Sequence, residues 1–140
     1  MNTASLEFLK GLGSRMDLDF GGRKGGMFHG SPRDDDEYVF KREANSELLR
    51  IADVEIVITG HTHRPYVKTL PEGILVNPGS VGQPRDGDSR ASYLMYFVED
   101  RAFRIRRVAY PARQAAEAIW AAGLPEYLGT RLLVEDSERF

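Results

Sequence analysis

Residues 54–65 read Val-Glu-Ile-Val-Ile-Thr-Gly-His-Thr-His-Arg-Pro. The first six are β-branched or apolar apart from Glu55, and such a run is typical of a central strand covered on both faces. Gly60 ends that strand, and two histidines follow within three residues. In open α/β sheets, functional residues gather beyond the carboxyl ends of the strands. The stretch therefore predicts a buried strand with a site at its end.

Hydrophobic spacing predicts further elements on both sides of this strand. Upstream, we expect a helix over 5–12, a strand over 15–20, a glycine-rich turn over 21–26, a short strand at Met27-Phe28, and a helix from Asn45 or Ser46 to about Ala52. Downstream, we expect a strand over 74–76, a hairpin of strands over 92–98 and 103–110, a helix from Pro111 to Gly123, and a short amphipathic segment over 126–134. Alternating strands and helices indicate an α/β architecture.

Length and composition set limits on the class of protein. The chain has 140 residues, of which 41% are hydrophobic and 29% charged, so we expect a single domain over residues 1–140. Nineteen Lys and Arg against 21 Asp and Glu leave a net charge of −2, which argues against nucleic acid or an anionic membrane as the partner. Neither a membrane span nor a signal peptide is recognisable, so we expect a cytoplasmic protein.

The chain has no cysteine and three histidines. Without thiols, only histidine and carboxylate side chains remain as strong metal ligands. His61 and His63 would face the same way in an extended backbone, and His29 also follows a short apolar strand. If the two strands are neighbours, all three rings converge. Spacing alone leaves two interpretations open: a metal site, or histidines hydrogen-bonded to the backbone.

Three motifs together resemble a known family. They are Phe-His-Gly-Ser-Pro at 28–32, Gly-His-Thr-His-Arg-Pro at 60–65 and Asn-Pro-Gly-Ser-Val-Gly at 77–82. In this order they are similar to the later motifs of the calcineurin-like metallophosphoesterases, most of all the small prokaryotic phosphodiesterase-type branch. The resemblance implies the later half of an α/β sandwich, with one mixed sheet, outer helices, and a C-terminal β-hairpin plus helices.

The resemblance also implies a two-metal centre that hydrolyses phosphomonoesters or phosphodiesters. His29 and His61 would bind one ion and His63 the other, with manganese, iron or zinc as the usual metals. The ions would activate a bridging hydroxide that attacks phosphorus. Gly60, Asn77 and Ser80 would support the ligands. The loop over 77–82 either offers backbone N–H groups to a phosphate or acts as a turn that supports the histidines.

The earlier motifs of the family are absent before His29. These are Asp-x-His, Gly-Asp and Gly-Asn-His-Asp, and the single Gly-Asp, Gly87-Asp88, comes too late in the chain. Three neutral imidazoles offer no anionic bridge between two dications. We therefore expect an incomplete centre that becomes active when an N-terminal half is supplied in the same or another chain. The alternative is a truncated, non-catalytic remnant that binds metal or a partner.

Several other features bear on this hypothesis. An incomplete sandwich predicts an exposed apolar face, to be covered by the N-terminal half or by a second copy in a homodimer. A simpler centre would be one zinc ion held by all three histidines. We expect the acidic run at 34–37 to be solvated surface rather than a source of ligands. Arg64, Arg85 and Arg90 could contact an anionic substrate.

Overall fold

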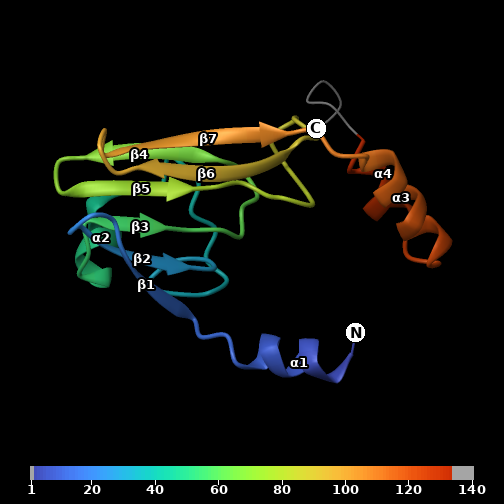
Figure 1. Ribbon diagram of the computed structural model, residues 1–140, viewed down its shortest axis with the longest axis horizontal. Helices are drawn as coiled ribbons and strands as arrows, with labels where there is room; N and C mark the ends of the chain where they lie inside the picture. The colour runs from blue at the N-terminus through green and yellow to red at the C-terminus, as the bar shows by residue number, and fades with distance from the viewer. Residues whose placement is uncertain (1, 134–140) are drawn as a thin grey trace.

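A mixed five-stranded sheet forms the centre of the computed structural model, which describes residues 2–133 (Figure 1). The strands are β1 (Arg15–Asp19), β2 (Lys24–Phe28), β3 (Ile56–Ile58), β4 (Tyr66–Leu70) and β5 (Gly73–Asn77). Their order in the sheet is β1-β2-β3-β5-β4, with β2, β3 and β5 parallel and the two outer strands antiparallel to their neighbours. The predicted mixed α/β architecture is thus confirmed.

Both faces of the sheet are covered, as the apolar sequence of β3 predicted. On one face, α2 (Ser46–Ala52) packs Leu48 and Leu49 against Val57 and Leu75. On the other, the hairpin of β6 (Ala91–Phe97) and β7 (Ala102–Val108) packs against a second cluster around Ile58 and Val76. All three residues of β3 are buried, because successive side chains point into opposite apolar layers.

Helix α2 begins and ends where the sequence predicted. The side chain of Asn45 accepts a hydrogen bond from the backbone N–H of Glu47 and so caps the first turn. Asp53 ends the helix in the left-handed conformation, with φ 54°. Asp53 therefore lies at the opposite end of β3 from the histidines, where it turns the chain into the strand.

Two features of the sheet differ from the sequence prediction. Strand β4 was not predicted, because it is an edge strand in which polar Lys68 and Thr69 interrupt the apolar pattern. Strand β2 begins at Lys24, so Gly25 and Gly26 lie in a strand rather than in the predicted turn. A Cβ atom on Gly25 would lie 2.4 Å from the ring of Phe20, so the aromatic ring fills that space instead.

The remaining helices project from one end of the sheet (Figure 1). They are α1 (Thr3–Lys10), α3 (Ala112–Ala121) and α4 (Glu126–Thr130). Helix α1 starts two residues earlier than predicted, since Asn2 caps it, and it buries none of its side chains. Helix α3 packs against α4, where Trp120 Nε1 donates to the carbonyl of Glu126 at 2.9 Å. Of the segment predicted over 126–134, residue 134 lies outside the described residues.

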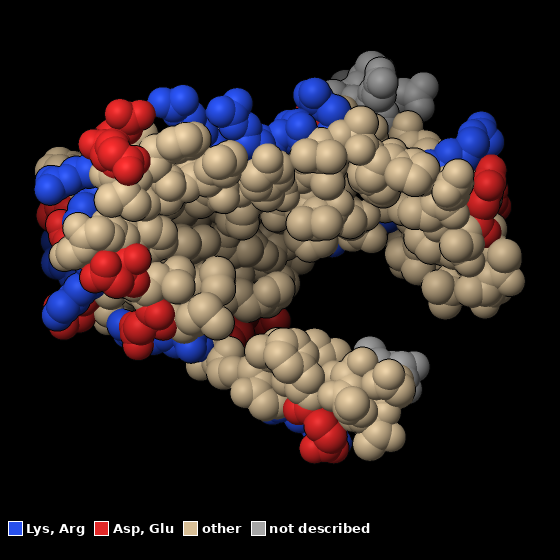
Figure 2. Space-filling model, viewed as in Figure 1, with Lys and Arg blue, Asp and Glu red and all other residues tan. Residues whose placement is uncertain are grey.

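Exposed apolar side chains gather on α1 and the nearby sheet edge. This set consists of Leu6, Phe8, Leu9, Leu12, Met16 and Met27. Figure 2 shows largely uncharged surface where α1 and the sheet edge face each other. The face of the sheet over β3 is not open, since the hairpin covers it. Exposed apolar surface is therefore present, but at α1, β1 and β2 rather than over β3 at the centre of the sheet.

Every helix within residues 2–133 is too short or too polar to cross a membrane. The cytoplasmic location stays a prediction.

The hairpin is held to the loop before it by Arg107 and Asp88. The guanidinium of Arg107 pairs with Asp86 and donates to the carbonyls of Asp88 and Arg90 at 3.4 and 3.2 Å. Hydrogen bonds from Arg90, aided by Arg107, lower the pKa of Asp88 to about 2. Arg90 is therefore engaged in an ion pair with Asp88, at 2.7 Å, and its contact with a substrate stays a prediction.

We expect Asp88→Asn to lower the free energy of unfolding by about 1 kcal/mol at pH 7, after allowance for solvent screening of a side chain that is 30% exposed. Because folding depresses the pKa of Asp88, its stabilisation is complete above pH about 4 and is lost as the pH falls towards 2. Urea unfolding at pH 7, 5 and 3 should show the difference between variant and parent narrowing at pH 3. In the matched control Asp100→Asn, which removes a more exposed ion pair, we expect a smaller difference at every pH. A pH-independent effect at Asp88 would contradict this account.

Candidate metal centre

His29 and His61 lie side by side at the carboxyl ends of neighbouring strands. Strands β2 and β3 are parallel, and Met27 is in register with Ile58, so the residues that follow them leave the same edge of the sheet. The N–H of Gly60 donates to the carbonyl of His29 at 2.8 Å and joins the two strand ends. His29 Nε2 and His61 Nδ1 are 2.9 Å apart, with the rings edge to face. The structure thus brings together two of the three predicted ligands.

The separation of these nitrogens fits two ligands of one ion. Imidazole nitrogens that bind one metal at about 2.1 Å, at tetrahedral or octahedral angles, lie roughly 3.0–3.4 Å apart. The observed 2.9 Å is close to that range. A small outward rotation of the rings would replace the shared hydrogen bond by two metal bonds. The pair therefore fits the role that the family resemblance gives it.

The loop between the two histidines of the motif is not extended, which corrects one expectation. His61 and His63 have φ of 58° and 57°, in the left-handed region. Thr62 between them is buried, and its N–H donates to the carbonyl of Gly60 at 2.6 Å in a tight turn. In this conformation the two rings need not point the same way. The expectation of an extended backbone is therefore wrong for this segment, whereas the convergence of the three rings stays a prediction.

Asn77, at the end of β5, holds this turn in place. Its side-chain Nδ2 donates to the carbonyl of Gly60 at 2.7 Å and to Thr62 Oγ1 at 3.1 Å. Its Oδ1 accepts from the N–H of Gly79 at 2.9 Å, which shapes the loop that follows. Asn77 is completely buried, so these bonds compete with no water. Of the two interpretations of residues 77–82, the bonds support a turn that buttresses the histidines.

His63 is positioned by a different loop. Its Nδ1 donates to the backbone carbonyl of Gln83 at 2.8 Å, which leaves Nε2 with a free lone pair. Metal-binding histidines commonly have this second hydrogen bond, because it fixes the ring and its tautomer. Ser80 Oγ accepts from the N–H of Gln83 and so sets the position of that carbonyl. Burial, and to a lesser extent Arg85, lowers the pKa of His63, which favours the neutral form that a metal requires.

The histidines do not form a complete ligand set by themselves. Within residues 2–133, no three His, Asp or Glu side chains lie close enough together to hold an ion. The idea of a single zinc ion held by all three histidines is therefore not supported. The acidic run at 34–37 is engaged elsewhere: Glu37 pairs with Arg33 and Ser31, and Asp34 accepts from the N–H of Asp36. No carboxylate of this run joins the histidines in a group of three ligands within residues 2–133.

Gly30 lets the acidic loop close behind His29. A Cβ atom at this position would lie 2.4 Å from the carbonyl oxygen of Asp35 and 2.6 Å from that of Asp34. Relieving these contacts would require a shift of the backbone, so we expect Gly30→Ala to lower the free energy of unfolding by about 2–3 kcal/mol. The matched control is Gly82→Ala, where the new Cβ meets nothing within 4 Å and the expected change is below about 0.5 kcal/mol. Chemical denaturation of both variants measures the difference, and equal stabilities would contradict the packing described.

Two aromatic residues near the histidines were missed by the sequence analysis. The centre of the Tyr38 ring lies 4.1 Å from that of His61. The centre of the Phe40 ring lies 6.1 Å from that of Tyr38. Tyr38 and Phe40 line a surface hollow together with Arg64 and Arg85, two of the three arginines proposed for substrate contact. A signal was present in Tyr38-Val39-Phe40, in which two aromatic side chains flank a residue that proves to be buried.

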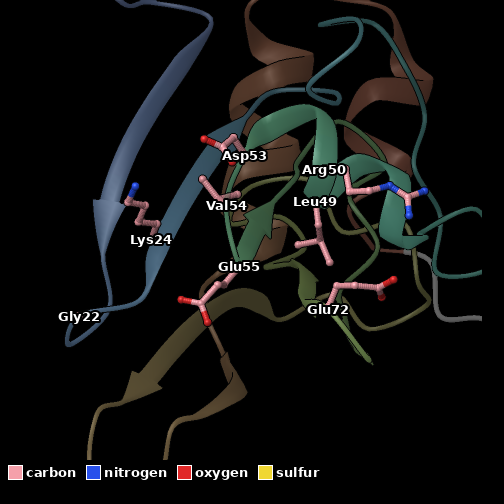
Figure 3. A pocket seen from close by; sticks show the side chains of 8 residues that line it. All are labelled: Gly22, Lys24, Leu49, Arg50, Asp53, Val54, Glu55 and Glu72. Atoms are coloured by element: carbon pink, nitrogen blue, oxygen red, sulfur yellow. The ribbon is translucent and has the colours of Figure 1, made fainter.

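A hollow at the opposite end of the strands has no such chemistry. It lies between the end of α2 and the β1–β2 turn, and Figure 3 shows its lining. Glu55 is paired with Arg23, and Glu72 accepts a hydrogen bond from Ser46. Asp53 and Glu55 precede β3 whereas His61 follows it, so this hollow is remote from the histidines.

The fold and the paired histidines define an α/β protein with a histidine-based candidate metal centre at the carboxyl edge of its sheet. The chain belongs to the calcineurin-like phosphoesterase superfamily, whose domain matches residues 2–101. It is 34% identical over 147 residues to an uncharacterized protein, MJ0912, of Methanocaldococcus jannaschii, in a match that covers 93% of this chain and 59% of that protein. It is also 33% identical over 88 residues to a probable metallophosphoesterase of Methanothermobacter thermautotrophicus, covering 61% of this chain and 48% of the relative.

A solved structure shows the same arrangement. A metallophosphoesterase from Sphaerobacter thermophilus superposes with a TM-score of 0.83 at 30% identity, over 96% of this chain and 64% of that one. This chain thus spans between about half and two thirds of the length of these relatives.

Proposed function

We propose that this chain supplies the histidine ligands of a two-metal centre that hydrolyses phosphoesters. The observation that carries the proposal is the 2.9 Å approach of His29 Nε2 to His61 Nδ1 in a member of this family. His29 and His61 would share one ion, and His63 Nε2 would bind the other. Manganese, iron and zinc all accept imidazole. When bound, the ions supply a hydroxide nucleophile and offset charge on the phosphoryl oxygens.

The chain's own residues would orient these ligands. Asn77 fixes the turn that presents His61, and the Gln83 carbonyl keeps the proton of His63 on Nδ1. Tyr38 packs against the His61 ring and shields one side of it from water. A rigid, partly dry surround of this kind holds ligands in place before the ions arrive.

The carboxylate ligands would come from an N-terminal half carrying the Asp-x-His, Gly-Asp and Gly-Asn-His-Asp motifs. A hollow of about 550 Å³ runs from Leu12 and Met16 along Met27 to His29. We call it the His29 hollow. Its apolar lining suits a packed segment of protein rather than a small polar ligand. A segment seated there would place its side chains beside His29, so the same contact would cover the apolar surface and complete the centre.

The test is reconstitution. The chain is mixed with the N-terminal portion of the Sphaerobacter thermophilus relative, and hydrolysis of bis-p-nitrophenyl phosphate is followed with added Mn²⁺. We expect turnover by the mixture and none above background by either component. A matched variant, Met16→Lys with Met27→Lys, should abolish association because it charges the apolar contact. Robust turnover by this chain alone, or an inert mixture whose components do associate, would contradict the proposal.

The second candidate is a non-catalytic remnant that binds a metal or a partner. It is favoured by one observation: residues 2–133 offer no set of three ligands to one ion. Metal analysis of the reconstituted mixture separates the two functions. Two ions per complex support the enzyme, whereas none supports the remnant. Size-exclusion chromatography with light scattering on the chain alone reports whether a second copy covers the apolar surface instead.

A further inference from the structure

A second hollow adjoins the segment that carries His61 and His63, since Thr62 and Arg64 belong to its lining. It has a volume of about 590 Å³ and is lined by Tyr38, Phe40 and the two residues that follow Phe40, and by parts of the segment after β3 together with Arg85. We call it the Tyr38 pocket. The ring of Tyr38 touches both the pocket and His61, with 4.1 Å between the centres of the two rings.

The charge of the Tyr38 pocket is opposite to that of the whole chain. Its lining contains four cations, Lys41, Arg42, Arg64 and Arg85, and among the described residues no Asp or Glu lines it. The chain as a whole has a net charge of −2. Arg42 pairs with Glu43, which lies outside the lining, whereas Lys41, Arg64 and Arg85 have no carboxylate partner within residues 2–133. A concave surface of this kind attracts anions.

Arg85 is the clearest anion-binding group in this lining. Its backbone N–H donates to the carbonyl of His63 at 3.2 Å, and its Nη2 donates to Gln83 Oε1 at 3.3 Å. Its Nε is buried and has no hydrogen-bond partner within residues 2–133. Buried donors are rarely left unsatisfied in native proteins, and each one calls for an explanation such as an absent ligand. Arg85 therefore combines a position next to His63 with a guanidinium that has no carboxylate partner within residues 2–133.

The aromatic side of the pocket is anchored to the rest of the fold. The rings of Tyr38 and Phe40 are 25° from parallel, and the guanidinium of Arg64 lies 6.0 Å from the centre of the Phe40 ring. The wall is held from behind, where Tyr66 donates to the carbonyl of Val39 at 3.2 Å. Lys68 Nζ also donates to the carbonyls of Lys41 and Ala44. Because this wall is already held in place, stacking of a planar ring on it costs little conformational entropy.

We propose that the Tyr38 pocket binds the leaving group of the substrate, and that this group carries a planar aromatic ring together with an anionic group. The ring stacks on Tyr38 and Phe40, and the anionic group bonds to Arg85 and Arg64. The proposal rests on the proposed function, since it names the substrate class of the same centre. It requires no metal for the binding step itself, and this makes it separately testable.

The experiment is isothermal titration calorimetry of the full chain in EDTA with three probes: 5′-AMP, ribose 5-phosphate and adenosine. 5′-AMP carries both ring and phosphate, whereas the other two each lack one of them. We expect 5′-AMP to bind at least about tenfold more tightly than either of the others, since stacking on an aromatic side chain and a charge-assisted hydrogen bond each contribute at about this level.

Variants assign the two contributions. Tyr38→Leu should weaken 5′-AMP binding about tenfold and leave ribose 5-phosphate within about twofold. Arg85→Gln should weaken both about tenfold. Arg106→Gln, an exposed arginine on β7 away from the pocket, is the matched control and should change neither. Tyr38 is 47% exposed, so we expect Tyr38→Leu to fold normally. If that variant does not fold, Phe40→Leu tests the stacking contribution instead.

Three results would overturn the inference: no saturable binding of 5′-AMP, equal binding of 5′-AMP and ribose 5-phosphate, or equal losses in Arg85→Gln and Arg106→Gln. Failure here with turnover in the reconstituted mixture would refute the pocket but not the phosphoesterase. Binding of 5′-AMP without turnover would refute the phosphoesterase but not the pocket.

Discussion

Asn77→Asp is expected to lower the free energy of unfolding by about 3–5 kcal/mol, the largest loss of stability anticipated for a single polar substitution in this chain. The exchange keeps the shape of the side chain but replaces the Nδ2 donor by an oxygen, which would face the carbonyl of Gly60. It also places a carboxylate at a completely buried position. A buried charge without a compensating partner costs about this much.

The same exchange at Asn45 provides the control. Asn45 caps α2 at the surface, and Asp is as good a helix cap as Asn, so we expect a change within about 1 kcal/mol. Urea unfolding of both variants at pH 7, followed by circular dichroism, measures the difference. If Asn77→Asp were no more harmful than Asn45→Asp, Asn77 would not hold the histidine turn as described.

Substitution of the paired histidines is expected to have the largest effect on activity. In the reconstituted mixture, His29→Ala or His61→Ala should lower kcat/KM for bis-p-nitrophenyl phosphate by about 10³-fold, since a metal ion contributes several kcal/mol to the transition state. Because the two nitrogens are 2.9 Å apart and would share one ion, the double variant should be little worse than either single one.

Two controls protect this interpretation. Each variant must still associate with the N-terminal portion, and Asn45→Ala, remote from the centre at the start of α2, should leave turnover unchanged. Independent losses that multiply in the double variant would show that His29 and His61 do not act through one ion. Retention of most of the activity in His61→Ala would show that His61 is not a required metal ligand.

The parts of the fold that could be predicted are those decided by local chemistry. Strand β3 is apolar throughout because both of its faces are covered, and α2 is bounded by a side-chain cap at Asn45. The hairpin of β6 and β7 was predicted from alternating apolar and polar residues on both sides of a turn. By contrast, β4 is an edge strand stabilised by pairing with β5, so its mixed composition gives little signal.

The position of the candidate site in the fold could be predicted from the sequence, but its geometry could not. Two histidines after a buried strand and a third after its neighbour indicated a site, and β2 and β3 do pair as that argument required. The left-handed turn at His61 and His63 is imposed by Asn77 and Thr62, whose bonds join residues 15 or more positions apart. Tyr38 reaches His61 from an irregular loop, and no local pattern predicts such a contact.

The most direct test of the metal centre uses the histidines themselves. With three histidines in the chain, selective ¹⁵N labelling gives three resolvable sets of ring signals by NMR. During titration of the reconstituted mixture with Zn²⁺, in which only this chain is labelled, we predict that the Nε2 signal of His29 and the Nδ1 signal of His61 shift together at the same zinc concentration. The Nε2 signal of His63 should shift separately, while its Nδ1 keeps its proton. Ring signals that stay unchanged in excess Zn²⁺ would contradict the assignment of these histidines as metal ligands.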